Sequence, residues 1–312
     1  MTQLSDAELG QYGFMLELRL RRQNGVAFQD FFASVMARRH GSDYVAIRPM
    51  GKTGDKGCDG YLQSTGCVYA CYGKINDAGL NSNSVTDKME EDYAKAAGQL
   101  ADILQEWRFV HNMYDGMPIT VPQKINTMSK ANPSTKFGLF GPEAFWETIN
   151  GMSRVDLDHL VGPVVVATDV RNLNIQEVAD LINGVIDGMD RPVVDEAPIA
   201  LPTNKIELNK ITGHWKLQLE TGMQNAKLVR DYVNAQASTR PLLGQTVANA
   251  VGAKYQDLSA QDLSPETILA HLFDAIAGKV QITPQRTTAT IALLCYLFKA
   301  CDIFESGAGT PT

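Results

Sequence analysis

The sequence lacks the long apolar runs, the glycine motifs and the positive charge that mark several large protein classes. No apolar run approaches the ~20 residues that a membrane-spanning helix needs. A phosphate-binding loop and a dinucleotide-binding glycine pattern are both missing, which excludes nucleotide hydrolysis by those routes. The net charge of −7 has the wrong sign for a protein that coats nucleic acid through a general positive field. Any contact with nucleic acid must therefore be local, or shared with a partner.

Cysteine is scarce, and the chain has an odd number of five. The odd number, and the absence of a signal peptide pattern, predict reduced thiols in a cytoplasmic protein. Cys67 and Cys71 have the spacing of half a zinc site, but no second cysteine pair or suitably spaced histidine lies near them in the sequence. We therefore interpret them as small buried hydrophobic residues.

The first half of the chain alternates helical and strand patterns. Residues 8–40 predict one helix, or two helices broken at "QNG", and residues 86–106 predict another that opens at Thr86. Turn residues separate short β-type runs. The order predicts a mixed sheet with helices on both faces. Its expected strands lie at 44–48, 57–63, 67–73, 107–113 and 135–140, with further helices near 121–129 and from "GPEAF" onward.

The second half reads as helical after a change in composition. Residues 163–205 contain prolines and seven acidic against three basic residues, and we interpret them as a connector around one helical stretch that packs partly on its neighbours. From residue 206 onward, apolar residues recur at steps of three and four. Ser264 and Pro265 form a strong helix start. The predicted domains are an α/β domain at 1–162, the connector at 163–205 and an all-helical domain at 206–312.

Glycine and acidic residues gather in "GKTGDKGCDGYL", residues 51–62, just before the strand pattern "CVYACYGK". The αβββαβ order resembles the restriction-endonuclease-like superfamily, the PD-(D/E)XK nucleases. "GVAFQDFF" resembles the Gly-x-x-Phe-Glu helix of their Mrr-like branch, and "GDKGCDG" resembles that branch's Gly-Asp-x-Gly-x-Asp-Gly turn. "VYACY" falls where those proteins carry Glu/Gln-x-Lys. The resemblance spans residues 25–74.

The resemblance implies a Mg²⁺ site for phosphodiester cleavage, because Mg²⁺ needs several hard oxygen ligands. Asp59 takes the position of the metal-binding aspartate, and Asp55 on the turn could add a second carboxylate. Gln29 stands at the helix glutamate, Ala70 at the Glu/Gln and Tyr72 at the lysine, with Lys74 two residues further along the same expected strand face. Asp59, Gln29, Tyr72 and Lys74 are therefore the candidate catalytic residues of a degenerate site.

Three interpretations of this turn stay open. Its aspartates could accept backbone hydrogen bonds in an ordinary hairpin, form a working nuclease site, or belong to a nuclease-like fold kept for binding. Five arginines, Arg19, Arg21, Arg22, Arg38 and Arg39, could meet phosphates, although a solvated helix face is the commoner arrangement. We interpret His111, at a strand end with Asp115 nearby, as a hydrogen-bonded structural residue.

A second resemblance covers the rest of the chain. "KIELNKI", "NAKLVRDYV" and the terminal "IALLCYLFKACDIFE" are similar to the C-terminal domain of the ABC-three-component system proteins. That family fuses a variable N-terminal effector to a helical C-terminal domain, beside a small middle component and an ABC-type ATPase, in loci assigned to bacterial defence against phages and plasmids. The resemblance implies these two partner proteins, and contact with nucleic acid such as DNA.

Two functions from different classes follow. The first is a defence component that binds or senses nucleic acid through a degenerate nuclease-like domain and docks partners on its helices, or cuts, with Mg²⁺, once partners complete the site. The second is a scaffold that never touches nucleic acid. The sequence leaves open whether the chain forms a homo-oligomer and whether it is an enzyme.

Overall fold

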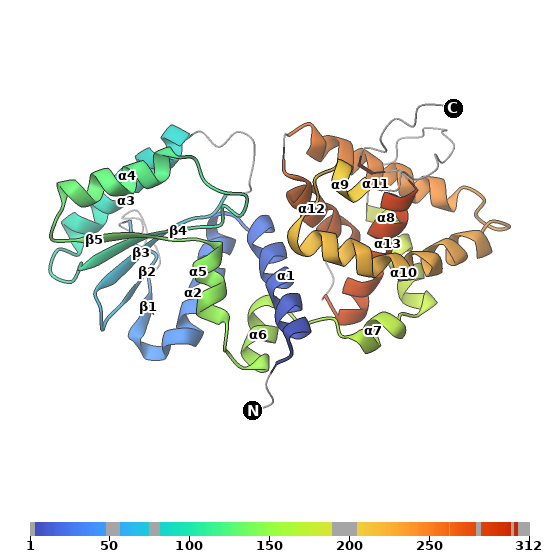
Figure 1. Cartoon of the computed structure of the whole chain (residues 1–312), viewed down its shortest axis with the longest axis horizontal. Helices are drawn as coiled ribbons and strands as arrows, with labels where there is room; N and C mark the ends of the chain where they lie inside the picture. The colour runs from blue at the N-terminus through green and yellow to red at the C-terminus, as the bar shows by residue number, and fades with distance from the viewer. Residues whose placement is uncertain are drawn as a thin grey trace. The chain divides into compact units, whose positions relative to one another are not determined.

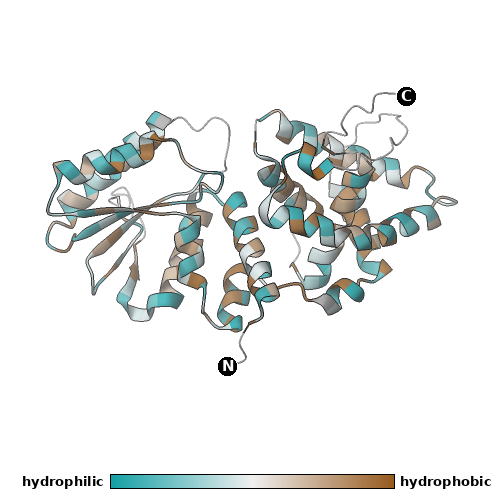
Figure 2. Cartoon of the chain, viewed as in Figure 1, coloured by the Kyte–Doolittle hydropathy of each residue, from teal (hydrophilic) through white to brown (hydrophobic). Residues whose placement is uncertain are grey.

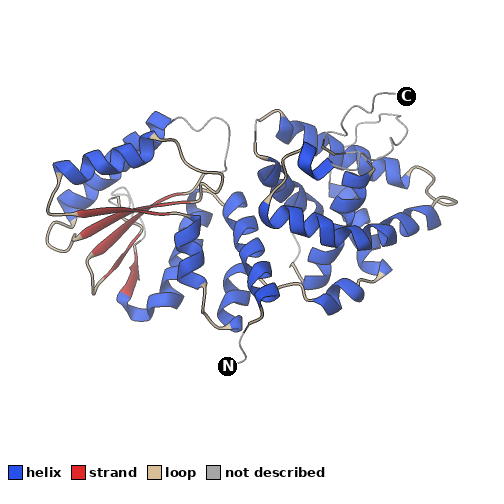
Figure 3. Cartoon of the chain, viewed as in Figure 1, coloured by secondary structure: helices blue, strands red, loops and turns tan. Residues whose placement is uncertain are grey.

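The chain forms two compact units (Figure 1). The computed structural model describes residues 4–47, 57–74, 82–188, 205–261, 263–278, 282–300 and 303–304. The first unit comprises Leu16–Val161, and the second comprises Thr2–Met15 with Gly162–Thr312. All the described strands lie in the first unit, and the described elements of the second unit are helices (Figure 3).

The predicted first helical region is two helices, α1 (Asp6–Arg22) and α2 (Gly25–His40). The break lies at "QNG" because Gly25 has a φ of 47°, a conformation that costs glycine little. Buried Asn112 holds the break in place. Its Nδ2 donates to the carbonyl oxygens of Leu20 and Gln23 at 2.9 and 2.7 Å.

The first unit contains a five-stranded mixed sheet in the order β1-β2-β3-β4-β5. The hairpin strands β1, β2 and β3 pair antiparallel, whereas β3, β4 and β5 pair parallel. The prediction that the four strands from 44 to 113 share one sheet is confirmed, and the fifth joins them. The strands are Tyr44–Ala46, Gly60–Leu62, Cys67–Tyr72, Glu106–His111 and Lys136–Phe140.

Helices cover both faces of the sheet, as predicted (Figure 1). Helices α2 and α5 (Pro142–Ile149) pack on one face, and α3 (Ser82–Gln99) and α4 (Thr120–Ala131) pack on the other. A short 3₁₀ turn (Gly41–Asp43) joins α2 to β1, and α6 (Arg154–Val161) follows α5. Hydrophobic colour runs along the strands between these two helical layers (Figure 2).

Helix α3 differs from its predicted bounds of 86–106. It begins four residues before Thr86, whose hydroxyl instead donates to the carbonyl of Asn83 at 3.0 Å. It also ends at Gln99, because the backbone N–H groups of Gln105 and Glu106 donate to the carbonyl of Gly66 at the entrance to β4. Strand pairing therefore takes the donors that a longer helix would have used.

The second unit is built around α13 (Pro284–Lys299). Eleven of its 16 residues are buried, and an apolar helix buried on all sides is expected to lie at a domain centre. Helices α7, α8, α10 and α12 pack against it (Figure 1). The other helices of this unit are α7 (Ala167–Arg171), α8 (Ile175–Gly188), α9 (Lys205–Leu208), α10 (Gly213–Ala235), α11 (Leu243–Ser259) and α12 (Pro265–Ala277).

Helix α8 is the helical stretch predicted inside 163–205. The sequence interpretation expects that segment to pack partly on its neighbours, and one face of α8 is buried against α10, α11, α12 and α13. The physical reason is its apolar face, which must be covered by other helices. That face consists of Val178, Ala179, Leu181, Ile182, Val185 and Ile186.

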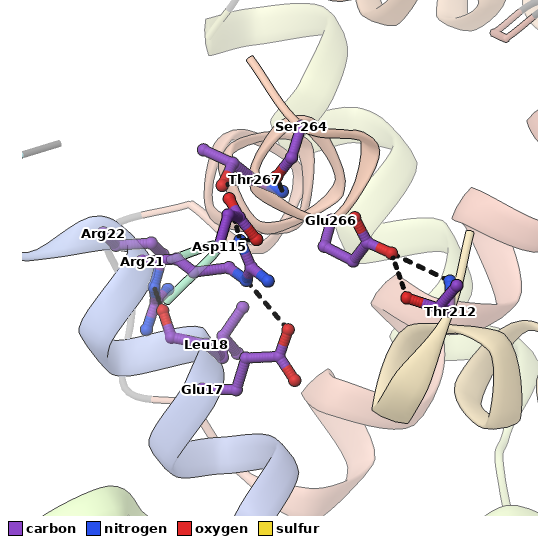
Figure 4. Close-up of polar contacts among 9 residues, drawn as sticks. All are labelled: Glu17, Leu18, Arg21, Arg22, Asp115, Thr212, Ser264, Glu266 and Thr267. Carbon is purple, nitrogen blue, oxygen red and sulfur yellow. Dashed lines mark hydrogen bonds and ion pairs between the residues drawn. The ribbon is translucent and has the colours of Figure 1, made fainter. Parts of the chain in front are cut away.

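The predicted start of α12 is confirmed. The Ser264 hydroxyl accepts a hydrogen bond from the backbone N–H of Thr267, Pro265 is the first helical residue, and Gly278 ends the helix with a φ of 73°. A buried carboxylate adds a second fixed point. Glu266 Oε1 accepts from the backbone N–H and the hydroxyl of Thr212 at 2.8 and 2.9 Å (Figure 4).

Lys205 anchors the C-terminal end of α13. Its side chain is buried, and its ammonium group donates to the carbonyl oxygens of Phe298 and Ile303 at 2.7 and 2.6 Å. The same Nζ lies 4.5 Å from the centre of the Phe298 ring. A cation at this end satisfies carbonyls that have no partner within the helix.

Gly222 allows α10 and α13 to pack closely, and its replacement tests that contact. A Cβ at Gly222 would lie 2.5 Å from Ile291 Cγ2 and 2.8 Å from Cys295 Sγ, so we expect Gly222→Ala to destabilise the protein by about 1–3 kcal/mol. The matched variant is Gly10→Ala in α1, where nothing lies within 4 Å of the new Cβ. Gly10→Ala should stabilise by about 0.5–1 kcal/mol. Denaturant unfolding measures both, and equal effects would contradict this packing.

Candidate functional site

Asp59 lies between β1 and β3, directly before β2. Its backbone N–H donates to Tyr69 at 2.8 Å, and its carbonyl accepts from Ile47 at 3.0 Å. Its carboxylate Oδ2 accepts a hydrogen bond from the backbone N–H of Cys71 at 2.6 Å. A charged acceptor of this kind forms a short, strong hydrogen bond. The aspartate that the resemblance assigns to metal binding thus holds the edge of β3.

The thiol and phenol groups discussed here, close to Asp59, are neutral. Burial, and then the Asp59 charge, raise the pKa of the Cys71 thiol well above its ordinary value. Burial, followed by the nearby Cys71 and Asp59, also raises the pKa of the Tyr44 hydroxyl. The Cys58 thiol contacts the carbonyl of Gly60 at 3.4 Å. Protonated thiols are poor metal ligands and poor nucleophiles, so the cysteines here act as buried small residues.

Ala70 and Tyr72 belong to the core on the α3 and α4 side of the sheet. Ala70 is 1% exposed and packs in the cluster that includes Trp107 and Phe109. The Tyr72 ring stacks on Phe109 with 5.6 Å between centroids. An aromatic ring in this position takes the space of the lysine expected from the resemblance, and neither side chain supplies a hard oxygen ligand to this core.

Lys74 and Gln29 lie outside β3. The strand ends at Tyr72, and a Cβ on the following Gly73 would lie 2.4 Å from Phe28. The backbone N–H of Lys74 then donates to Asn112 Oδ1 at 3.1 Å. Lys74 was expected on the same strand face as Ala70 and Tyr72, but β3 ends before it. Gln29 is half-buried on α2.

The described residues do not fit an Mg²⁺ site. Asp55 lies outside the described residues, and the Asp59 carboxylate is engaged with Cys71. Within the described ranges, no group of three or more His, Cys, Asp or Glu side chains is arranged to hold a metal ion. The structure brings Asp59 to the backbone of β3, and it places Gln29 on α2 and Lys74 beyond the strand end.

Most of the arginines that could have met phosphates are engaged within the first unit. Arg21 is 3% exposed and pairs with Glu17 and Asp115, both at 2.8 Å (Figure 4). Arg19 donates to the carbonyl of Leu160 at 2.6 Å, and its pKa is lowered mainly by burial. Buried ion pairs of this kind fix helix positions. The interpretation of a solvated face is thus wrong for Arg19 and Arg21, while Arg38 pairs with Asp156 at the surface.

The end of β4 holds two buried polar residues, His111 and Asn112. Burial lowers the pKa of His111 to about 4, so its imidazole is neutral, and Nδ1 accepts from the backbone N–H of Met113 at 3.3 Å. This geometry agrees with the predicted structural role. Sequence reasoning missed Asn112, because an asparagine after a strand gives no signal of which distant carbonyls it will meet.

The first unit is a mixed α/β sheet domain, and the second is a helical domain. Residues 174–305 match the model of C-terminal domain 10 of the ABC-three component (ABC-3C) systems. The match supports the family resemblance and the helical C-terminal domain, and this family implies a component of a bacterial defence system. The N-terminal unit lies outside the match.

No curated protein and no solved structure matches the chain. Among the described residues, no helix has the length and apolar character needed to cross a membrane.

Two substitutions at Asp59 test its structural role. Asp59→Ala leaves the Cys71 N–H without this acceptor, so we expect a loss of about 1–3 kcal/mol in unfolding free energy. Asp59→Asn keeps an oxygen that can accept the same hydrogen bond and should cost clearly less. Urea unfolding of the two variants beside the wild type checks this, and an Asp59→Ala protein as stable as the wild type would contradict it.

His111 should make stability depend on pH. Its folded pKa of about 4 lies below its ordinary value of 6.5, so the unfolded chain takes up the proton first as the pH falls. The contribution of neutral His111 to the free energy of unfolding is fully present above pH 6.5. It is lost as the pH falls toward 4, by roughly 3 kcal/mol in all. In His111→Gln this component disappears. Unfolding at pH 7, 6, 5 and 4 measures it, and parallel curves for both proteins would contradict the neutral imidazole.

Proposed function

We propose that this protein is a component of an ABC-three component defence system, with a degenerate nuclease-like domain that binds or senses nucleic acid and a helical domain that docks partner proteins. The match of residues 174–305 to a C-terminal domain of those systems carries the proposal. A helical domain whose core is complete around α13 can present its outer helix faces to other proteins.

The nuclease-like part of the proposal is supported by the order of the first unit. Its chain order from α2 to β4 is αβββαβ, with an antiparallel hairpin followed by a parallel strand. That arrangement is the one the restriction-endonuclease-like resemblance implies. The Asp59 turn also precedes β2, where the resemblance expects its aspartate.

The contacts of the site favour binding over cleavage. Metal-dependent hydrolysis requires an ion held by several hard ligands, so that it can activate water and stabilise developing charge. The Asp59 carboxylate is hydrogen-bonded to the backbone of β3, and Ala70 and Tyr72 pack in the core. A site with these commitments needs partner proteins or other residues before it can cut.

The Asp59–Cys71 hydrogen bond also favours a second candidate, a scaffold without nucleic-acid contact. The hydrogen bond gives the turn aspartate a structural purpose by itself. Fluorescence anisotropy with labelled single-stranded and duplex DNA and RNA separates the candidates. Salt-dependent binding supports the nuclease-like sensor, and no binding to any of the four supports the scaffold.

We predict that the purified chain leaves plasmid and single-stranded DNA intact in Mg²⁺ or Mn²⁺, and that it co-elutes with the ABC-type ATPase and middle component that the family resemblance implies. Losing metal-binding carboxylates costs orders of magnitude in rate, because electrostatic stabilisation is usually the largest catalytic contribution. Gel analysis of the plasmid and size-exclusion chromatography of the co-expressed components measure the two parts. Cutting by the lone wild-type chain that Asp59→Asn abolishes would overturn the degenerate site.

Matched surface variants locate the docking. Leu217→Glu and Leu242→Glu place a charge on apolar residues of the helical unit that are 51% and 68% exposed, and we expect each to weaken co-elution. The controls are Ile119→Glu and Val155→Glu in the first unit, which are 70% and 75% exposed in the wild type. If the controls weaken co-elution and the helical variants do not, the helical unit is not the docking domain.

A further inference from the structure

The second unit contains a half-open cavity of about 680 Å³ that has no part in the proposed function. Its walls come from the first turns of α1, from α7 and the residues before it, and from α10 and α13. The helices α7, α10 and α13 lie together in Figure 1. The volume falls within the ~300–1,000 Å³ of ordinary small-molecule sites.

The walls of the cavity are firmly placed. The Asn225 side chain donates to the carbonyl of Val170 at 3.0 Å, and the Gln285 side chain donates to Asp169 at 3.1 Å, which fixes α7 to α10 and α13. Phe14 of α1 meets Trp215 of α10 edge to face, with 5.0 Å between ring centroids. A site with walls fixed in this way is formed before a ligand arrives, so little ordering cost remains.

Thr287 gives the cavity an unused hydrogen-bonding group. It lines the cavity, is 1% exposed, and its Oγ1 has no hydrogen-bond partner among the described residues. Two nearby threonines of α13 behave differently, since Thr288 and Thr290 donate to the carbonyls of Pro284 and Arg286, each at 2.8 Å. A buried hydroxyl left unpaired costs stability, so its retention here suits a ligand that completes it.

The lining carries one charge of each sign, and the two charged side chains differ in what they contact. Of the two charged residues in its lining, Glu8 already accepts hydrogen bonds from the backbone and the hydroxyl of Ser5 at 2.9 and 2.8 Å. Arg171 is exposed at the cavity and has no ion-pair partner within the described part of the chain. Most of the lining surface is apolar, with Val165, Val170 and Ile291 among it, although its residues also include the polar side chains of Gln218, Gln224 and Asn225.

We propose that this cavity binds a small amphipathic molecule with an apolar body and a single anionic group. The apolar body lies against Val165, Val170 and Ile291, the anionic group pairs with Arg171, and a polar atom of the ligand completes the hydrogen bonding of Thr287. Val–Ile walls with a few convergent polar groups are the usual composition of such sites. The proposal concerns the second unit alone and stands whether or not the first unit binds nucleic acid.

The full-length protein with two fluorescent probes tests the proposal. The probes are 1-anilinonaphthalene-8-sulfonate and its neutral counterpart, N-phenyl-1-naphthylamine, which has the same rings without the sulfonate. We expect one saturable site that prefers the anionic probe, and Arg171→Gln should remove that preference. Because Arg171 is exposed, this variant leaves the fold intact. A missing saturable site, or an unchanged preference in Arg171→Gln, overturns the proposal.

A substitution that fills the cavity is the second test of the proposal. Thr221 is an exposed lining residue of α10, and Thr221→Trp should weaken anionic-probe binding at least about ten-fold by occupying the entrance. The matched control is Lys227→Trp, on the same helix at a 72% exposed side chain that does not line the cavity. Equal binding by Thr221→Trp and Lys227→Trp would place the probe elsewhere and overturn the assignment.

Replacing Thr287 tests whether its unpaired hydroxyl serves a ligand or only the fold. Thr287→Val removes a buried hydroxyl without a partner, so it should raise the Tm of the ligand-free protein by about 2–4 °C. It should also weaken anionic-probe binding about five-fold. Thr290→Val removes a hydroxyl that is already bonded, and it should produce neither change. A fall in Tm for Thr287→Val would show that the fold uses this hydroxyl and would overturn its role.

Discussion

The α/β unit depends on the hydrogen bonds of one buried amide, that of Asn112. Its Nδ2 donates to the carbonyls of Leu20 and Gln23 at the end of α1, and its Oδ1 accepts from the backbone N–H of Lys74. Three backbone groups that no strand or helix can pair are thereby satisfied, and each would cost about 1–3 kcal/mol if left buried and unpaired. The α1–α2 break, the end of β3 and the end of β4 are fixed together by this one side chain.

This constraint shapes the candidate site as well. Lys74 is held by its backbone just past β3, and Asp59 is held through its carboxylate on the N–H of Cys71. A metal-dependent nuclease needs its carboxylates free to converge on an ion, whereas here one accepts a backbone hydrogen bond from β3. The Asp59 turn is therefore explained by the physical needs of the sheet, and the nuclease-like fold is the part of the resemblance that the proposal retains.

The sequence predicted the elements whose signals are local. Strand alternation around β3, the Ser264–Pro265 start of α12 and the "QNG" break each depend on residues within one turn of the feature. It mispredicted the end of α3, which distant partners set. Helix α3 ends where strand pairing with Gly66 takes over. Asn112 and the cavity at Thr287 had no local signal in the sequence, because the hydrogen bonds of Asn112 and the walls of the cavity are formed with residues from separate segments.

Both units contain buried polar atoms without a hydrogen-bond partner, so what distinguishes Thr287 is its place in a cavity. Among the described residues of the α/β unit, His111 and Cys71 are uncharged and Arg21 is bound to Glu17 and Asp115. Such groups stabilise a fold and have little capacity left for a ligand. In the helical unit, Thr287 and Arg171 line a cavity with their bonding capacity unused. Capacity that the fold leaves unused in a preformed cavity is available to a ligand, which supports the proposal that the helical unit, rather than the aspartate turn, binds a small molecule.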